Sequence, residues 1–350
     1  MPRHARWDYR PIEKDNMPKE GSPTIYDVAA LAGMSIATIS RVLNSPERVT
    51  DVTRVKVLAA IDQLGYIPKA EARARALQRT RRIGVLTPFF TAPSFVQRLR
   101  GIAAALTDNN FELIIYTIES LSRLKGYLAT LPLTGDLDGL IVVSLPLAVE
   151  EMERLTHHQL ETVVIESKQR FFSSVEIDDH AGGRMAAQYL LGRGHCHFGF
   201  LGDIHPPEYA IHPIIARLAG FQDSLLQAGI HLPKEAIQSA SYDQEISRQA
   251  ARKLLSLPVR PTAIFAASDV QAIAVMKVAG EYNLKIPQDL AVIGFDDLEM
   301  ADYVGLTTIR QPLDDSGRLA AEILTARLVD PRRPVQHIQL PLTLVERETV

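Results

Sequence analysis

The sequence contains little of what marks several large classes of protein. Its only cysteine, Cys196, excludes an intrachain disulfide. No apolar run approaches the roughly 18 residues that a membrane-spanning helix needs. The first 21 residues lack the apolar centre of a secretory signal. These absences predict a soluble, cytoplasmic protein with no membrane partner.

The motifs of common enzyme classes are also missing. The chain has no phosphate-binding G-x-x-x-x-G-K-[ST] loop, no G-x-G-x-x-G after a predicted strand and no G-x-S-x-G nucleophile motif. His195 and His197 flank Cys196, but no further cluster supports a metal site, and we expect the thiol in the core. The sequence therefore predicts no catalytic residue, no metal and no organic cofactor.

The net charge is small, but the charges are unevenly distributed. The net charge is -3 over 350 residues, and Lys and Arg number 38 against 41 Asp and Glu. Residues 1–82 hold 15 of the basic residues against 9 acidic ones, so the remainder is strongly acidic. Within residues 69–82, six residues are basic and one is acidic. A basic head on an acidic body favours a polyanionic partner, although charge alone also allows a solvated linker.

Residues 22–66 show the pattern of three short helices. Thr24 with Asp27 three residues later forms a capping box, and Gly33 suits a left-handed helix end. Ser35 then provides a new N-cap after a short turn. We expect a third helix at about 53–64 whose buried stripe consists of Val55, Leu58, Ala59, Ile61 and Leu64.

Two helices joined by a glycine-containing turn of about three residues are typical of a helix-turn-helix. In that motif the second helix presents its N-terminal side chains to the major groove of DNA. A generic three-helix bundle is the alternative. The basic tract that follows favours DNA binding.

From Ile83 onward, short apolar runs alternate with helical patterns. The runs include RIGVLTP, DGLIVVS, HFGFLG, TAIFAAS and LAVIGFDD. Strands that alternate with helices predict parallel sheets covered on both faces. About ten strands over 260 residues exceed one small sheet, so we expect an α/β core of two doubly wound parallel-sheet subdomains.

Several segments in order resemble the LacI/GalR (lactose-repressor) family of bacterial regulators. The matching segments are TIYDVAALAGMSIATISRVLN, RVKVLAAIDQLGYIP, ARARAL, IDDHAGGRMAAQYLLGRGH, RLAGFQDSLLQAG, IPQDLAVIGFDD and LTTIRQPL. The resemblance runs from about residue 23 to residue 348. It implies an all-α helix-turn-helix head, a hinge helix and a core similar to periplasmic sugar-binding proteins.

The resemblance also implies a domain organisation. We expect a disordered extension at 1–21, the DNA-binding domain at 22–68, the hinge at 69–82 and the effector-binding core at 83–350. The N-terminal subdomain of the core would comprise about 82–179 and 310–341. The C-terminal subdomain would comprise about 180–309 and 342–350.

The head and the hinge supply the expected DNA contacts. Ile36 and Ala37 would face base edges at the tip of the recognition helix, and Arg41 suits a guanine O6/N7 contact. The short hydroxyls suited to phosphates are those of Ser35, Thr38 and Ser40. The hinge candidates are Ala72, Arg73, Arg75 and Leu77. Arg75 stands where the family commonly places its wedging leucine, so Leu77 either takes that role or packs against its dimer mate.

The expected effector site lies at the carboxyl ends of the strands, where open α/β sheets bind ligands. The aromatic rings of Phe89 and Phe90 could stack on a sugar. The resemblance carries Asp178, Arg217 and Asp296 over as ligand-binding positions, and Ser268 and Asp269 follow a neighbouring strand. The structural alternative is that they form ion pairs or helix caps, Asp269 above all. Ser268 and Asp179 stand where family members often have Asn, and Glu166 where Asp is common.

We therefore expect a sequence-specific transcriptional regulator, most simply a repressor, of double-stranded operator DNA that is controlled by a small molecule such as a sugar. The absence of a heptad tail favours a homodimer over a tetramer. Two alternatives are a stand-alone sugar-binding protein and a Rossmann-type enzyme with an accessory DNA-binding head.

Overall fold

The computed structural model describes residues 23–44, 49–64, 66, 80–205, 207–211, 213–241 and 243–350. The chain forms two compact units, residues 1–78 and residues 79–350. The predicted extension at 1–21 and the predicted hinge contacts Ala72, Arg73, Arg75 and Leu77 lie outside the described residues.

The first unit contains α1 (Ile25–Ala32), α2 (Ile36–Asn44) and α3 (Asp51–Leu64). The capping box at the start of α1 is present, because the backbone N–H of Thr24 donates to Asp27 at 2.7 Å. Gly33 ends the helix with φ +64°, a conformation that glycine adopts without steric cost. Ser35 then caps α2 by accepting from the backbone N–H of Thr38 at 3.2 Å.

The core of this unit differs from the predicted stripe of the third helix. Val57 and Ala60 are the buried residues of α3, whereas Val55 and Leu58 are exposed. Val57 and Ala60 pack with the buried residues of α1 and α2, which are Val28, Ala29, Ile39 and Val42. The expected stripe was therefore wrong at Val55, Leu58 and Ala59, which are exposed, whereas Ile61 and Leu64 do pack against this core. The error arose because α3 carries apolar residues on more than one face.

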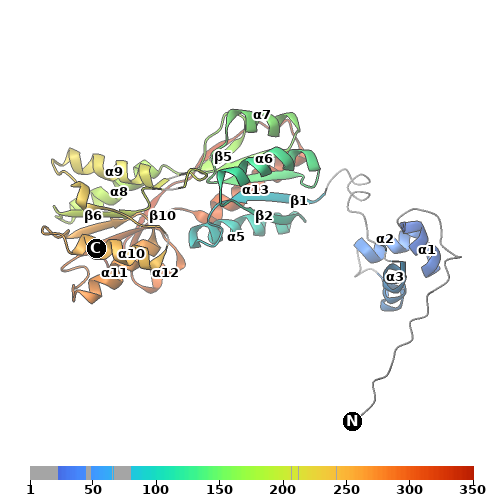
Figure 1. Ribbon diagram of the computed structural model, residues 1–350, viewed down its shortest axis with the longest axis horizontal. Coiled ribbons are helices and arrows are strands. Elements are labelled where there is room, and N and C mark those ends of the chain that lie inside the picture. The colour runs from blue at the N-terminus through green and yellow to red at the C-terminus, as the bar shows by residue number, and fades with distance from the viewer. Residues whose placement is uncertain are drawn as a thin grey trace, which may run out of the picture. The chain divides into compact units, whose positions relative to one another are not determined.

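The second unit contains two six-stranded sheets, as the alternating pattern predicted (Figure 1). We call the first sheet and its helices the N-terminal subdomain. Its strand order is β11-β5-β4-β3-β1-β2, and the pairs are all parallel. Its elements are β1 (Arg82–Thr87), α5 (Pro93–Asp108), β2 (Glu112–Thr117), α6 (Leu121–Thr134), β3 (Gly139–Val143), α7 (Val149–His157), β4 (Glu161–Ile165), β5 (Ser173–Glu176), α13 (Leu313–Val329) and β11 (His337–Gln339).

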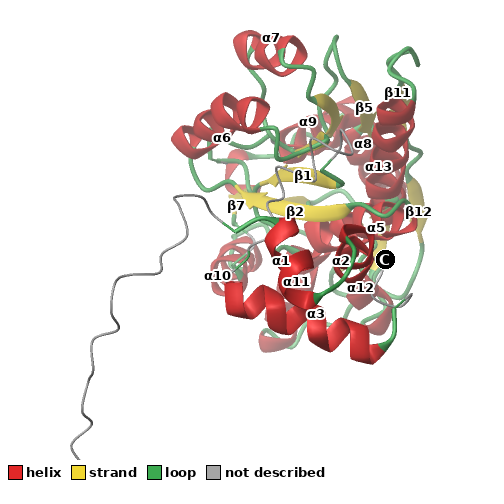
Figure 2. Cartoon of the chain, turned by 90° about the vertical axis from the view of Figure 1, so that its right-hand side faces the viewer, coloured by secondary structure: helices red, strands yellow, loops and turns green. Residues whose placement is uncertain are grey.

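Helices cover both faces of this sheet. Figure 2 shows α6 and α7 on one side of the strands and α5 and α13 on the other. Two buried clusters correspond to these faces, one that includes Ile102 and Leu324 and one that includes Leu128 and Leu155. Strands buried on both faces explain why their sequences read as continuous apolar runs instead of alternating ones.

The C-terminal subdomain repeats this plan with strand order β12-β10-β9-β8-β6-β7. Its edge strand β12 runs antiparallel to β10, which the expectation of purely parallel sheets did not include. Its elements are α8 (Asp179–Gly192), β6 (Phe198–Gly202), α9 (Pro213–Gln227), β7 (Ile237–Ser239), α10 (Gln244–Leu255), β8 (Ala263–Ala266), α11 (Asp269–Glu281), β9 (Ala291–Asp296), α12 (Glu299–Tyr303), β10 (Thr307–Arg310) and β12 (Thr343–Val345).

The chain crosses between the two sheets three times: after β5, after β10 and after β11. The segments at these crossings are residues 177–178, 311–312 and 340–342. Loops at the carboxyl ends of the strands of both sheets therefore face one another, and the second crossing, at Gln311, lies among them.

Glycines bring helix backbones into direct contact in the C-terminal subdomain. A Cβ at Gly183 of α8 would lie 1.9 Å from the carbonyl oxygen of Arg217 in α9. A Cβ at Gly220 of α9 would lie 1.9 Å from the carbonyl oxygen of His180 in α8. No side chain fits in either place, so these glycines set the distance between the two helices.

The N-terminal subdomain uses the same device between α5 and α13. A Cβ at Gly101 would lie 2.0 Å from the carbonyl oxygen of Asp314, and one at Gly317 would lie 2.0 Å from that of Arg98. In both subdomains the packed helix carries a buried arginine three residues before its glycine, Arg98 before Gly101 and Arg217 before Gly220.

No single helix among the described residues is long and apolar enough to cross a membrane. The short helices α1 and α2 reach the required length and composition only together, across a bend of 100°. Cys196 is exposed, which corrects the expectation of a core thiol; it lies in the turn before β6.

Candidate nucleic-acid interface and effector cleft

The N-terminal end of α2 presents the residues predicted to read DNA. Ser35, Ala37 and Arg41 are exposed, and the side chain of Ile36 is 40% exposed. Ile39 and Val42, on the opposite face, are buried against α1 and α3. Burial of that face fixes which side of α2 is free to meet a partner.

The hydroxyls of this surface are already partly engaged. Ser35 and Thr38 share a hydrogen bond of 2.9 Å between their oxygens, in addition to the cap bond. Ser40 is half-buried. Arg41 has no ion pair with any residue that the structure describes, so its guanidinium is available for a base edge or a phosphate.

A cavity of about 30 Å³ lies at the second crossing, where the two subdomains meet. The N-terminal subdomain lines it with Phe89, Ser94, Phe95 and Glu166. The C-terminal subdomain lines it with Asp203, Ile211, Pro213, Ile214, Arg217 and Asp296, and Gln311 completes it. This volume holds about two water molecules, so a larger ligand requires the cleft to widen.

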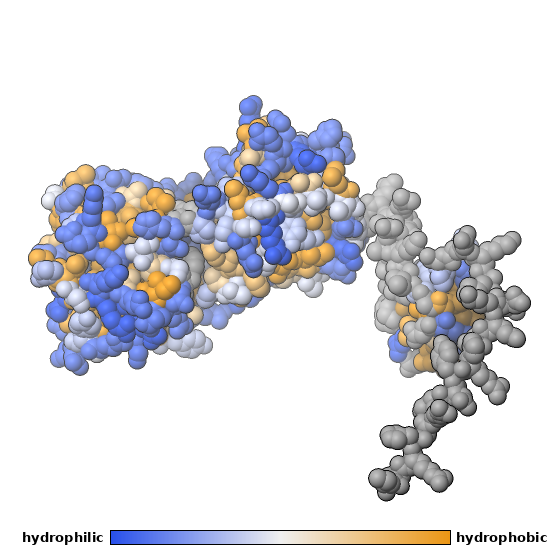
Figure 3. Space-filling view, in the orientation of Figure 1, coloured by the Kyte–Doolittle hydropathy of each residue, from blue (hydrophilic) through white to orange (hydrophobic). Residues whose placement is uncertain are grey.

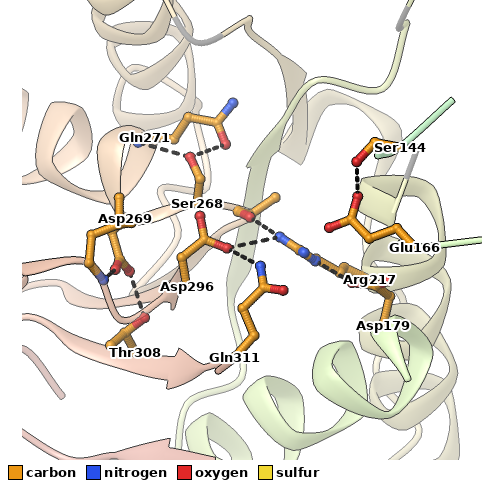
Figure 4. A network of polar contacts seen from close by, with 12 residues as sticks. Ser144, Glu166, Asp179, Arg217, Ser268, Asp269, Gln271, Asp296, Thr308 and Gln311 are labelled. Carbon is orange, nitrogen blue, oxygen red and sulfur yellow. Dashed lines mark hydrogen bonds and ion pairs between the residues drawn. The ribbon is translucent and has the colours of Figure 1, made fainter. Parts of the chain in front are cut away.

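Arg217 is the centre of the C-terminal wall of this cavity (Figure 4). Its side chain is 4% exposed; its Nε donates to Asp179 at 2.8 Å and its Nη1 to the carbonyl oxygen of Ala267 at 2.7 Å. The guanidinium lies 3.6 Å from the centroid of the Phe295 ring. A second carboxylate, Asp296, lies 3.8 Å from Nη1. These contacts fix the guanidinium in one orientation.

Arg98 has the corresponding role in the N-terminal subdomain: it does not line the cavity, but it pairs with Glu166, which does. Its side chain is 3% exposed, and its Nη2 donates to Glu166 at 2.6 Å while its Nε donates to Ser316 at 3.0 Å. The hydroxyl of Ser144 donates to the other oxygen of Glu166. Each wall of the cavity therefore contains a carboxylate that is paired with a buried arginine, Asp296 with Arg217 and Glu166 with Arg98.

Burial and nearby charges shift the pKa values of three carboxyl groups at this site in opposite directions. Burial raises the pKa of Asp296 to about 6, against the opposing effects of Arg217 and the hydrogen bond from Gln311. Burial also raises the pKa of Asp179, although Arg217 opposes it. Burial opposes ionisation of Glu166 as well, but the charge of Arg98 and the bond from Ser144 together lower its pKa. Groups with divergent pKa values in a cleft are typical of functional sites.

The backbone is strained at the strand ends that form the cavity. Positive φ angles occur at Phe89 (+46°), Ser144 (+53°), Glu166 (+65°) and Asp296 (+111°). Non-glycine residues rarely adopt this region, and such conformations cluster at ligand sites. Four strained strand ends at one site indicate that the placement of these side chains is kept despite its cost in backbone energy.

A segment of the C-terminal subdomain, residues 207–211, contacts the N-terminal subdomain. The backbone N–H of Ile211 donates to the carbonyl oxygen of Ser144 at 2.8 Å. Tyr209 packs against a buried cluster of the N-terminal subdomain, and its ring lies 6.3 Å from that of Phe89. These two contacts link the C-terminal subdomain to the N-terminal subdomain beside the cavity.

The structure brings three of the seven predicted effector residues to the cavity, namely Phe89, Arg217 and Asp296. Phe90 is 42% exposed and does not line the cavity. Asp178 is exposed and caps α8 by accepting from the N–H of Ala181 at 2.8 Å. Its neighbour Asp179 is the residue that pairs with Arg217.

Ser268 and Asp269 have structural roles outside the cavity. Ser268 caps α11 by accepting from the N–H of Gln271 at 3.3 Å, so the cap is Ser268 and not Asp269 as expected. Asp269 is fully buried and accepts from the Leu298 N–H at 2.7 Å and from Thr308 at 2.6 Å. It ties the start of α11 to the loop after β9 and to β10.

The sequence prediction missed Arg98, Gln311 and Asp203. A signal for Arg98 was present: Arg98-Leu-Arg-Gly101 in α5 repeats the R-L-x-G spacing of Arg217-Leu-Ala-Gly220 in α9. Both helices follow the first strand of their subdomain. Nothing comparable marks Gln311, which reaches the site only because the chain crosses there.

A larger cavity of about 590 Å³ also lies between the subdomains. It shares Phe89 and is lined by apolar residues such as Ile273, with Arg248 and Lys277. It contains no buried carboxylate–guanidinium pair, so we assign the effector to the smaller cavity despite its size. No group of three or more metal-ligating side chains occurs among the described residues.

Comparison with known proteins covers both units of the chain. Residues 24–69 match the bacterial regulatory proteins of the lacI family, and residues 187–350 match the periplasmic binding protein-like domain. The ribose operon repressor of Escherichia coli (strain K12) is 33% identical over 330 residues, which cover 93% of this chain and 98% of that protein.

Two solved structures extend the comparison. The lac repressor dimer bound to operator and an anti-inducer is 26% identical, with a TM-score of 0.72 and coverage of 94% of this chain and 99% of that one. A LacI family regulator from Enterococcus faecium with bound ribose is 29% identical, with a TM-score of 0.68 and coverage of 77% and 98%. The head, the two-subdomain core and the extent of these matches agree with the predicted resemblance, and this chain belongs to the lacI family of bacterial regulatory proteins.

Proposed function

We propose that this protein is a transcriptional repressor whose affinity for operator DNA is controlled by a small polyhydroxylated effector, such as a sugar, bound in the cleft at Arg217. The observation that carries the proposal is the pair of buried arginine–carboxylate groups, one in each wall, that meet at a cavity. A ligand between two walls stabilises one arrangement of the subdomains over another, which is the requirement for a switch.

The DNA-binding role rests on α2. We propose that Ile36 and Ala37 contact base edges, that Arg41 reads a guanine, and that Ser35, Thr38 and Ser40 contact phosphates. Ile36 and Ala37 have no hydrogen-bonding side chain, so they suit thymine methyl groups. The hinge residues Ala72, Arg73, Arg75 and Leu77 remain proposed minor-groove contacts.

The effector role rests on Phe89, Arg217 and Asp296, together with Glu166 and Gln311. Carboxylates accept from hydroxyl groups while guanidinium and amide groups donate to them, so the set can engage neighbouring hydroxyls. The Phe89 ring offers an apolar surface for a sugar face. The ribose-bound relative supports this class of ligand. Phe90, Asp178, Ser268 and Asp269 do not line this cavity, so their contact with the ligand stays a prediction.

We propose that the DNA-binding form of the protein is a homodimer. We also propose that it acts in the cytoplasm and has no enzymatic activity. The lac repressor structure is a dimer on operator DNA. Figure 3 shows apolar surface over the α5 and β2 side of the N-terminal subdomain, where Val96 is 50% exposed and Ile115 is 40% exposed. A second copy of the chain would remove such surface from water.

Operator binding with and without candidate sugars tests the proposal. The operator is selected from random duplexes with the purified full chain, and its affinity is then measured by fluorescence anisotropy as each sugar is added. We expect at least one neutral sugar to change operator affinity by about 5–150-fold, the usual range of allosteric coupling. Specific operator binding that no small polyol alters contradicts the effector role but leaves the DNA-binding role intact.

A further inference from the structure

The effector cavity has an excess of negative charge. Three carboxyl groups line it, those of Glu166, Asp203 and Asp296, and a fourth, that of Asp179, contacts Arg217 directly. The opposing charges are the guanidinium groups of Arg217 and Arg98. Among the residues that the structure describes, Arg217 is the one arginine that lines this cavity, and no lysine lines it.

Both guanidinium groups are engaged by carboxylates of the protein. Arg98 lies 2.6 Å from Glu166, and Arg217 lies 2.8 Å from Asp179 and 3.8 Å from Asp296. An anionic ligand would have to compete with these carboxylates for the same cations. A buried anion that gains no cation of its own is strongly disfavoured because it loses its hydration.

Two carboxylates of the cavity, Asp296 and Asp203, have oxygens that can accept further hydrogen bonds. One oxygen of Asp296 accepts from Gln311 at 2.6 Å, and no bond to its other oxygen is found among the described residues. Asp203 is half-buried at the cavity, and its bond to the N–H of His205, at 3.4 Å, is long. Ionised carboxylates are acceptors only, so they select ligand groups that donate.

Apart from the hydroxyl of Ser94, the remaining wall is apolar. Phe89, Phe95, Ile211, Pro213 and Ile214 line the cavity and offer no hydrogen-bond donor from their side chains. The Ser94 hydroxyl is the one uncharged donor of this wall that no carboxylate of the described residues engages, because Gln311 and Arg217 already donate to Asp296 and Asp179. A phosphate or carboxylate on the ligand would otherwise face carboxylates or hydrocarbon. Hydroxyl and ammonium groups would face acceptors, and C–H surfaces would face the aromatic rings.

We infer that this cleft selects its effector by charge: it admits uncharged and amine-bearing polyols and rejects phosphorylated or carboxylated ones. The inference rests on the proposed function and deepens it, because it names the chemical class that the same site accepts. Asp203 contributes to the rejection without belonging to either buried ion pair.

Matched probes of one sugar skeleton test this inference on the full chain. Thermal shift and operator anisotropy are measured with glucose, glucosamine and glucose 6-phosphate, with galactose, galactosamine and galacturonate, and with ribose and ribose 5-phosphate. We expect binding to be confined to neutral and amino members of any series that binds. An anionic member that binds as tightly as its neutral counterpart overturns the inference; if it also alters operator affinity, the proposed function stands.

A charge variant sharpens the result. In Asp203→Asn the preference for a neutral over an anionic member of one series should fall by about tenfold, the effect of one nearby charge at a partly buried site. Asp136→Asn, an exposed carboxylate in the N-terminal subdomain, should leave that ratio unchanged. An unchanged ratio in Asp203→Asn contradicts the inference. If no probe of any charge alters either readout, the proposed effector class fails and the inference fails with it.

Discussion

Gln311 donates a hydrogen bond of 2.6 Å from its Nε2 to Asp296. Its Oε1 lies 3.5 Å from Nη2 of Arg98, in the other subdomain. One side chain on a crossing segment therefore contacts the charged groups of both walls. Any change in the angle between the walls must alter at least one of these contacts, so Gln311 is placed to couple them.

Gln311→Leu should weaken the effector response, because it removes the contact to both walls. It should also lower the free energy of unfolding by about 1–3 kcal/mol, since Asp296 loses a donor in a buried site. Urea unfolding and effector titration of operator binding measure the two effects. Gln249→Leu, at an exposed site on α10, is the control and should change stability by less than about 0.5 kcal/mol. Equal behaviour of the two variants would contradict the coupling role.

Arg217→Ala and Asp296→Ala should each abolish the effector response. If the effector releases DNA, operator affinity without effector should stay within a few fold of the parent protein. If the effector instead promotes DNA binding, both variants should bind operator weakly with or without it. Because Arg217→Ala removes the cation that pairs with Asp179 and Asp296 in a buried site, it should also cost about 3–5 kcal/mol of stability. A normal effector response in both variants is incompatible with the assigned cleft.

Arg41→Ala should reduce discrimination between operator and scrambled DNA by about 1–3 kcal/mol, the value of one good base contact. Competition anisotropy with the two duplexes measures the ratio. Arg154→Ala, on α7 in the core, serves as the control and should keep the parental ratio. If Arg41→Ala also keeps it, α2 does not read the sequence through this residue.

Operator affinity should fall steeply as salt rises. The basic head displaces condensed counterions from DNA, so the logarithm of affinity falls linearly with the logarithm of salt concentration, by about 0.9 per neutralised phosphate. Anisotropy titrations between about 50 and 200 mM salt measure this slope. A slope near zero would exclude the electrostatic role assigned to the head.

Effector affinity should depend on pH near 6. Burial raises the pKa of Asp296 to about 6, and a ligand that donates to its carboxylate binds the ionised form. Protonation removes that acceptor, so affinity should fall as the pH drops through 6 and level off above about 7. Calorimetry between pH 5 and 8 measures this, and Asp296→Asn should lose the dependence. Affinity that rises toward low pH would show that the ligand prefers the protonated carboxyl.

Gly220→Ala should be strongly destabilising, because its Cβ would lie 1.9 Å from the carbonyl oxygen of His180. The helices must separate, which costs about 1–3 kcal/mol or more. Gly280→Ala in α11 meets no atom within 4 Å and should stabilise the protein by about 0.4–1 kcal/mol. Thermal unfolding of both variants tests the difference. Equal effects would mean that α8 and α9 are not held by this contact.

The sequence predicted the fold class because its signals are local. Capping residues such as Thr24 and Ser35 act within one turn, and apolar runs such as that of β9 mark buried strands wherever they pack. The strands β5, β10, β11 and β12 were missed, because each contains only one or two large apolar residues. The antiparallel direction of β12 depends on a crossing that local pattern does not encode.

The site was only partly predictable for a related reason. Arg217 and Asp296 were found through the resemblance, while Arg98 and Gln311 are brought to the cavity by contacts across more than 200 residues of chain, such as Arg98 to Ser316. Asp178 and Asp179 are adjacent, and only the geometry of the α8 N-terminus decides which caps the helix and which pairs with Arg217. Neighbouring residues of one type cannot be separated by pattern alone.

The glycine contacts between paired helices have an evolutionary consequence. Gly183 and Gly220 fix α8 against α9 through main-chain atoms, and Gly101 and Gly317 do the same for α5 and α13. The spacing of each helix pair is thereby set by main-chain contacts and not by the side chains that touch the effector. Substitutions at strand ends can alter ligand preference while the helix pairs of both subdomains keep their spacing. Few substitutions would then be needed for such a chain to respond to a different effector. The same property makes it a scaffold for biosensors of other small molecules.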